Sequence, residues 1–294
     1  MPSVEHEEMV ALMAGGLGLD QLSVAEQRAA MEASATMFEV PAEVSVETLS
    51  IAGIQADWLR EGDASSTRTV LYLHGGGYVM GSRVSHRALA ARLAVAAQAQ
   101  VLVPDYRLAP EHPFPAALHD SLTCWRWLQD RGDGTGGLSL AGDSAGGGLA
   151  LATVLSLRDA GAALPDCVVA MSPWTDLLAT GDSATSGEVN DPLFTLEGIR
   201  AGGRLYAGDA VADPLASPLL ADLRALPPLL LQVGTRELLL SDSTRFADRA
   251  RTAGCSVTLE VEPELIHVWQ MFAHLPEAIA AMQRQGAFIR RHSG

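Results

Sequence analysis

The sequence predicts an α/β fold: a mostly parallel sheet of eight strands flanked by helices. From residue 69 onward, short apolar runs alternate with longer stretches of helical periodicity. Such alternation is typical of a parallel sheet covered by helices. The chain has 294 residues, of which 48% are hydrophobic, as in a globular protein. We therefore expect one domain spanning residues 1–294.

The first 40 residues are expected to be helical. The segment "SVAE" at Ser23–Glu26 is a capping box, and an amphipathic stretch before it is broken at Gly15-Gly16. Pro41 closes this region, and the periodicity then changes. The segments "EVSVETLS" and "IQADWLR" alternate and are separated by Ala52-Gly53, which predicts a pair of strands.

The rest of the chain predicts six further strands and the helices between them. The strands are expected at Thr69–Leu73, Val101–Pro104, Leu138–Ala141, Cys167–Met171, Leu229–Val233 and Ser256–Val261. The helices are expected near 86–98, 116–130, 146–160, 243–253 and 276–290. The segment between the strands at 167–171 and 229–233 is too long for a simple crossover, and Thr195 is placed to cap a helix within it. Such insertions typically build lids or substrate walls.

The charge balance argues against two kinds of partner. The net charge is −15, whereas a protein that binds nucleic acid or an anionic membrane needs a basic surface. All 20 basic residues are arginine, and the absence of lysine excludes Schiff-base chemistry, Ser–Lys dyads and the phosphate-binding lysine of a P-loop. No apolar stretch reaches the ~18 residues of a membrane span. The acidic start "MPSVEHEEMV" is unlike a secretory signal, so we expect a cytoplasmic protein.

The cysteines and histidines predict neither disulfides nor a metal site. Cys124, Cys167 and Cys255 are odd in number and far apart, and no HExxH pattern occurs. We expect no metal.

A glycine-rich segment singles out one serine as a nucleophile. "LSLAGDSAGGGLALA" places Ser144 in a G-x-S-x-G pattern between a predicted strand and a predicted helix. In a nucleophile elbow, small flanking residues allow the sharp turn that exposes the hydroxyl above a sheet. Two similar patterns lack this context. Gly181–Thr185 follows no strand and is expected to be a loop, and "GDGTGG", which fits G-x-G-x-x-G, precedes a strand instead of following one.

A serine nucleophile needs a base, and the base needs an orienting carboxylate. In this architecture the order along the chain is serine, acid, histidine. His267 follows the last predicted strand and is favoured over His274, which lies further on. The strand at 229–233 is followed by Glu237 and Asp242; we favour Glu237 because Asp242 stands where a helix cap is expected.

Two segments offer backbone N–H groups for the oxyanion of the reaction intermediate. One donor is the amide of Ala145, directly after the candidate nucleophile. The others are expected in "LYLHGGGYVMG", where consecutive glycines allow bare amides to approach the substrate. His74 precedes these glycines and is expected to support the loop rather than act as a base.

Long ordered segments resemble the bacterial branch of the hormone-sensitive-lipase-like family of α/β-hydrolase carboxylesterases. They are "HGGGYVMGS", "VLVPDYRLAPEHPFPAAL", "LAGDSAGGGLA", "SPWTDL", "DPLASPL", "LLLQVGTRELLLSDS" and "LIHVWQMF". The resemblance implies the α/β-hydrolase fold, Ser144 as nucleophile, His267 as base and an oxyanion hole at Gly76, Gly77 and Ala145. It also implies a cap built from about 1–40 and 177–225, and hydrolysis of short- to medium-chain acyl esters with no metal or cofactor.

One position departs from the family pattern. The family commonly has aspartate in a D-x-L motif, whereas this chain has Glu237-Leu238-Leu239. Glutamate is also a carboxylate able to accept the histidine proton, so Glu237 remains the expected acid and Asp242 the alternative.

Substrate and assembly stay open at this point. Pocket walls are expected from Tyr78, Met80, Trp174, Phe194 and Leu238. The expected partner is a small-molecule ester, with a lactone or an N-acetyl compound as alternatives for the same triad. A ligand-binding relative without activity is disfavoured because serine, carboxylate and histidine are all present. The resemblance also implies a possible homodimer through the edge strand at 256–261.

Overall fold

The computed structural model describes residues 2–13, 22–62, 68–132 and 136–293. Within these residues an eight-stranded sheet has the order β1-β2-β4-β3-β5-β6-β7-β8. The strands are β1 (Val44–Ile51), β2 (Ile54–Glu61), β3 (Thr69–Leu73), β4 (Gln100–Pro104), β5 (Leu138–Asp143), β6 (Val168–Met171), β7 (Leu229–Gly234) and β8 (Val257–Glu262). β2 pairs antiparallel with β1 and β4, and the remaining neighbours are parallel. The predicted mostly parallel eight-stranded sheet is confirmed.

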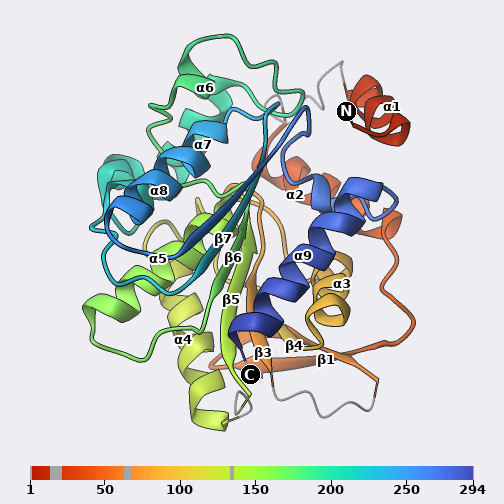
Figure 1. Cartoon of the computed structure of the whole chain (residues 1–294), viewed down its shortest axis with the longest axis vertical. Coiled ribbons are helices and arrows are strands. Elements are labelled where there is room, and N and C mark those ends of the chain that lie inside the picture. Colours follow the sequence, from red (N-terminus) through yellow and green to blue (C-terminus); the bar gives the residue numbers. More distant parts are fainter. Residues whose placement is uncertain (1, 14–21, 63–67, 133–135, 294) are drawn as a thin grey trace.

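Helices cover both faces of the sheet (Figure 1). The described helices are α1 (Val4–Met13), α2 (Val24–Ser34), α3 (Arg87–Ala97), α4 (Ala116–Arg131), α5 (Ala145–Asp159), α6 (Asp182–Thr185), α7 (Leu196–Ala207), α8 (Leu240–Thr252) and α9 (Pro276–His292). Side chains of α3 and α9 share one core with one face of the sheet, and those of α4, α5 and α8 belong to the core on the other face. The central strands read as continuous apolar runs because both of their faces are buried.

The two ends of the sheet are more exposed than its centre. Every residue of β7 is buried, whereas β8 has intermediate and exposed residues along its length. Because β8 is the last strand in the order, only β7 pairs with it among the described strands. In Figure 1, α6 and α7 lie above the ends of the central strands, on the side where α2 also lies.

Helix α2 is held by polar contacts. It has no buried residue, and its capping box joins Ser23 and Glu26 as the sequence predicts. Arg28 donates to the carbonyl oxygens of Val79 (2.7 Å) and Ala109 (2.9 Å). The helix is thereby attached to the loop that follows β3.

Most helix predictions are confirmed, with differences at helix starts. Thr195 caps α7 by accepting from the amide of Gly198 at 3.0 Å. α8 begins at Leu240, before the expected residue 243. The expectation of a loop at Gly181–Thr185 is wrong, because Asp182–Thr185 form the short helix α6. Gly15-Gly16 and residues 133–135 of "GDGTGG" lie outside the described residues. In the part of the chain that is described, no helix is both long enough and apolar enough to cross a membrane.

Candidate active site

Ser144 lies in the sharp turn between β5 and α5. Its backbone has φ +52° and ψ −122°, a strained conformation for a residue with a side chain. The two motif glycines are required by close backbone approach. A Cβ added at Gly146 would lie 2.0 Å from the carbonyl oxygen of Leu73, and one added at Gly142 would lie 2.4 Å from that of Gly146. The amide of Ser144 donates to the carbonyl of Met171 at 2.8 Å, which ties the turn to the end of β6.

His267 is oriented by Glu237. Nδ1 of His267 lies 2.8 Å from Oε2 of Glu237, and both side chains are buried. The other carboxylate oxygen, Oε1, accepts from the hydroxyl of Ser172 at 2.8 Å and from the amide of Gly234 at 2.5 Å. Nε2 of His267 has no hydrogen-bond partner among the described residues. One ring nitrogen is thus held by a carboxylate, and the other is available to a nucleophile.

The surroundings of His267 favour its protonated form. Burial by itself lowers the pKa of a histidine, but the hydrogen bond and charge of Glu237, together with the charges of Asp191 and Asp143, outweigh burial and raise the pKa of His267 above 6.5. A base with a raised pKa is stabilised as the imidazolium, which is the form that results when it accepts a proton.

Asp242 is directed elsewhere. Its Oδ2 accepts from the backbone amides of Thr175 (2.7 Å) and Asp176 (2.8 Å). The expectation that it caps a helix is wrong: it lies in the first turn of α8 and binds the amides of another loop, while Leu239 stands at the cap position. Between the two carboxylates that the sequence left open, Glu237 is the one in contact with His267.

The buried Asp242 predicts a dependence of stability on pH. Burial raises its pKa from 3.8 to about 7, aided by the charge of Asp176 and opposed by the two amides and Arg245. Between those pH values the folded chain holds a proton that the unfolded chain has released, so this contribution to stability is lost as pH rises toward 7. Asp242→Asn keeps an oxygen acceptor without the titration. We expect a free energy of unfolding that declines less between pH 5 and 8, measured by urea denaturation.

The matched control is the exposed carboxylate variant Asp209→Asn, which should keep the wild-type slope. A slope in Asp242→Asn equal to that of the wild type would contradict the assignment.

The loop after β3 carries the predicted oxyanion-hole glycines. Gly76 has φ +110° and Gly77 φ +63°, conformations that favour glycine, and a Cβ at Gly76 would lie 2.3 Å from the carbonyl oxygen of Met80. His74 is buried and stacks on Tyr106 with ring centroids 4.1 Å apart, while the Tyr106 hydroxyl donates to the His74 carbonyl at 2.6 Å. His74 therefore supports the glycine-rich loop through its contacts with Tyr106, as expected from the sequence.

The predicted pocket residues occupy different environments. Tyr78 is 1% exposed and stacks on Tyr206 with ring centroids 3.6 Å apart, and Trp174 is 4% exposed. Leu238 is also buried, and Met80 is partly buried. Phe194 lies edge-on to the His267 ring, with centroids 4.9 Å apart. Of the five, Phe194 is the one with a ring contact to His267.

Two residues that the sequence did not predict, Ser172 and Asp191, hold the segment that carries Glu237. The hydroxyl of Ser172 donates to Glu237 and accepts from the amide of Val268, next to His267, at 3.2 Å. The carboxylate of Asp191 accepts from the amide of Phe194 (3.1 Å) and from that of Leu238 (2.9 Å). A serine after a strand and an aspartate in an insertion are too common for either role to be predicted.

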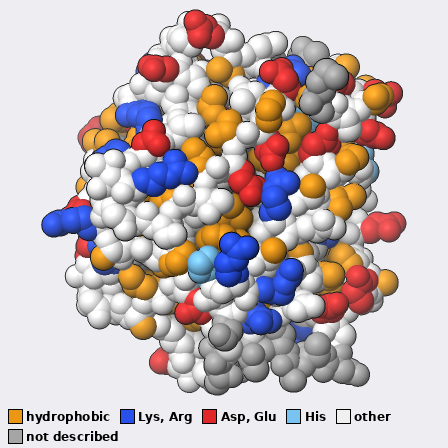
Figure 2. All heavy atoms as spheres, viewed as in Figure 1, with side chains coloured by type: hydrophobic (Ala, Val, Ile, Leu, Met, Phe, Trp, Pro, Cys, Tyr) orange, Lys and Arg blue, Asp and Glu red, His pale blue; other side chains and the backbone are white. Residues whose placement is uncertain are grey.

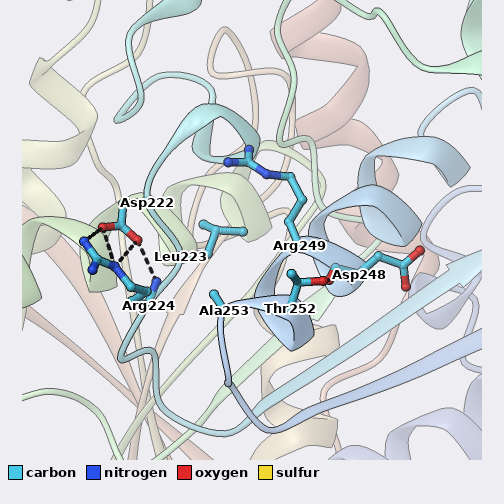
Figure 3. Close-up of a pocket in the computed structure, with 7 residues that line it drawn as sticks. All are labelled: Asp222, Leu223, Arg224, Asp248, Arg249, Thr252 and Ala253. Atoms are coloured by element: carbon cyan, nitrogen blue, oxygen red, sulfur yellow. Dashed lines mark hydrogen bonds and ion pairs between the residues drawn. The ribbon is translucent and has the colours of Figure 1, made fainter.

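A surface hollow of about 460 Å³ lies away from these residues (Figure 3). It is lined by Asp222, Leu223, Arg224, Asp248, Arg249, Thr252 and Ala253. Part of this lining lies in or just after the C-terminal half of α8 (residues 248–253), and the rest (residues 222–224) precedes β7, whereas Glu237 precedes the N-terminal end of α8. At ~1.5 Å of helix rise per residue, roughly 12 Å of α8 separates Leu240 from Asp248. The hollow is therefore distinct from the candidate active site.

On the face of the molecule shown in Figure 2, acidic and basic side chains are interspersed.

The fold, the strained serine turn and the His267–Glu237 pair define an α/β-hydrolase of the serine hydrolase class. A family model described as "alpha/beta hydrolase fold" matches residues 70–271. An esterase structure from the bacterial hormone-sensitive lipase family has a TM-score of 0.93 and 39% identity, covering 100% of both chains. The chain belongs to the α/β-hydrolase-fold family, in its bacterial hormone-sensitive lipase branch.

Other relatives carry related names. An acetyl-hydrolase of Streptomyces hygroscopicus is 43% identical over 84% of this chain and 83% of its own length. An esterase of Acinetobacter venetianus is 37% identical over 81% of this chain and 80% of its own. The structure of EstE5 soaked with p-nitrophenyl butyrate has a TM-score of 0.91 and 39% identity, covering 99% of both chains.

Proposed function

We propose that the protein hydrolyses short- to medium-chain acyl esters through an acyl-enzyme on Ser144. The observation that carries the proposal is the 2.8 Å contact between His267 Nδ1 and Glu237 Oε2, which leaves Nε2 free. In the first step Oγ of Ser144 attacks the ester carbonyl carbon while Nε2 of His267 takes the hydroxyl proton. The imidazolium then gives that proton to the leaving alcohol. Water, deprotonated by His267, cleaves the acyl-enzyme and regenerates Ser144.

The backbone amides of Gly76, Gly77 and Ala145 are the proposed oxyanion donors. Ala145 follows the nucleophile and opens α5, so its amide belongs to the unpaired first turn of a helix. Gly76 and Gly77 have no side chain to block their amides, and the loop is supported by His74 and Tyr106. Preorganised donors of this kind stabilise the charge that develops on the carbonyl oxygen.

The expected preference for short acyl groups is supported by the similarity to EstE5, an esterase whose structure was determined after soaking with p-nitrophenyl butyrate. A specific preference for acetyl groups, as ester or N-acetyl compound, is a second candidate, supported by the name of the 43% identical acetyl-hydrolase.

A series of p-nitrophenyl esters from acetate to palmitate tests the proposal. We expect kcat/KM to be highest for the short acyl chains and to fall steeply toward palmitate, in keeping with the family's preference for short- to medium-chain esters. Measuring kcat/KM for N-acetyl amides and lactones as well shows whether either class is a better substrate than the esters. Absence of turnover for every ester by folded wild-type protein would overturn the esterase proposal.

We also propose that residues 1–40 and about 177–225 form the cap of a single domain. In support, Arg28 binds the loop after β3, and Asp191 binds the amide next to Glu237.

A homodimer through β8 is likewise a proposal, supported by the place of β8 at the end of the sheet and by the 40% exposure of Val261. The cytoplasmic location stays a prediction.

A further inference from the structure

Asp143, the residue before Ser144, is a buried carboxylate whose hydrogen bonds go to the oxyanion loop and its strand. Its Oδ1 accepts from the hydroxyl of Tyr72 at 2.6 Å and from the backbone amide of Gly75 at 3.0 Å. Gly75 directly precedes the two glycines proposed as oxyanion donors. Asp143 is 2% exposed, so no bulk water competes for these contacts.

The Gly75 backbone lies against the carboxylate itself. A Cβ added at Gly75 would lie 2.1 Å from Oδ2 of Asp143. The position therefore requires glycine for close approach to a side chain. The backbone of the loop thus packs directly against the carboxylate of Asp143.

The other oxygen of Asp143 faces a buried histidine. Oδ2 lies 3.4 Å from Nε2 of His86, whose Nδ1 lies 2.9 Å from Oγ of Ser85. Ser85 in turn accepts from the amide of Ser82 at 2.8 Å, and the hydroxyl of Ser82 donates to Glu32 on α2. A chain of contacts thus connects the carboxylate of Asp143 with Glu32 on α2.

A buried negative charge beside the proposed oxyanion hole is unfavourable for two reasons. An anion beside the site where an oxyanion develops disfavours that oxyanion, and burial disfavours the carboxylate itself. The neighbouring His86 and the hydroxyl of Tyr72 outweigh burial and lower the pKa of Asp143. Charge-assisted hydrogen bonds are about twice as strong as neutral ones, so a carboxylate orders the loop better than a neutral acceptor.

We propose that Asp143 is a positioning residue for the oxyanion hole, acting through the amide of Gly75 on Gly76 and Gly77. This inference rests on the proposed esterase activity. It assigns to the variable residue of the G-x-S-x-G pattern a role beyond the effect of its charge on the pKa of His267, because the hydrogen bonds of Asp143 go to Tyr72 and to the loop.

The test compares Asp143→Ala with Asp143→Asn on p-nitrophenyl acetate. The asparagine can keep an oxygen acceptor for Tyr72 and Gly75, whereas the alanine removes it. We expect kcat to fall roughly 10- to 100-fold in Asp143→Ala, with KM changed less than about threefold, because a displaced donor weakens transition-state binding. Asp143→Asn should stay within about fivefold of the wild-type kcat, since it retains the neutral form of both hydrogen bonds.

A second readout separates positioning from a general loss of structure. A boronic acid that forms a tetrahedral adduct on Ser144 should bind Asp143→Ala less tightly by a factor similar to the loss in kcat, while the product carboxylic acid should inhibit it as it inhibits the wild type. Where Asp143→Ala does not fold, Tyr72→Phe, which removes one donor, replaces it, with a smaller loss in kcat expected.

The experiments distinguish failure of the proposed function from failure of the positioning role. A wild-type protein that hydrolyses no ester overturns the proposed function. An active wild type overturns the positioning role if Asp143→Ala keeps its kcat, if the loss appears in KM alone, or if boronic acid affinity is unchanged.

Discussion

Replacing Ser144 with alanine is expected to lower kcat for ester hydrolysis roughly 10⁴-fold or more, because the acyl-enzyme can no longer form. The effect should be on kcat more than on KM, since the serine hydroxyl adds little to ground-state binding. The folded structure should be kept, because alanine occupies less space at the strained position with φ +52°. Steady-state kinetics with p-nitrophenyl acetate and a thermal unfolding curve measure both quantities.

The chain provides a control with almost the same local sequence. Ser183 stands in "GDSAT", but it lies in α6, and its hydroxyl donates to the carbonyl of Leu238 at 2.6 Å. Ser183→Ala should therefore retain most of the activity. Near-normal turnover by Ser144→Ala would exclude Ser144 as the nucleophile.

Glu237→Gln is expected to lower kcat roughly 10³- to 10⁴-fold, in line with the loss seen when a triad acid becomes an amide. The amide has no charge to stabilise the imidazolium, and it presents either oxygen or NH₂ to Nδ1 of His267. The carboxylate also raises the pKa of His267. In the variant, the acidic limb of the kcat/KM profile should therefore move to lower pH, because the base stays neutral further down the pH range.

Asp242→Asn is the matched control for this variant. It makes the same change at a buried carboxylate five positions further on, and its contacts are with the amides of Thr175 and Asp176. Asp242→Asn should retain activity comparable to that of the wild type. The opposite pattern, an active Glu237→Gln and an inactive Asp242→Asn, would transfer the acid role to Asp242.

The regular elements of the sheet could be predicted closely because their cause is local. Thr69–Leu73 is predicted and observed with the same bounds, and Val101–Pro104 differs from β4 by one residue. Strands buried on both faces are continuous apolar runs, which a sequence displays directly. Helix starts were less predictable where no side chain marks them: α8 begins without a side-chain cap, three residues before the expected start.

The candidate nucleophile can also be predicted from the sequence itself. The turn at Ser144 needs small residues within two positions on either side, and Gly142 and Gly146 supply them. The clash at Gly142 is with the carbonyl of Gly146 within the same turn, so a short pattern predicts the turn, whereas the clash at Gly146 is with Leu73 on the neighbouring strand. The order of serine, acid and histidine follows in the same way from the order of the strands that precede them.

Only the tertiary structure decided what each carboxylate contacts. Glu237 and Asp242 follow the same strand and are chemically equivalent in the sequence, yet one orients His267 and the other binds the loop at Thr175. The hydrogen bonds of Asp143 and Ser172 likewise go to partners many residues away along the chain. A hydrogen bond requires two groups within about 3 Å, and the packing of the whole chain sets such distances between remote residues.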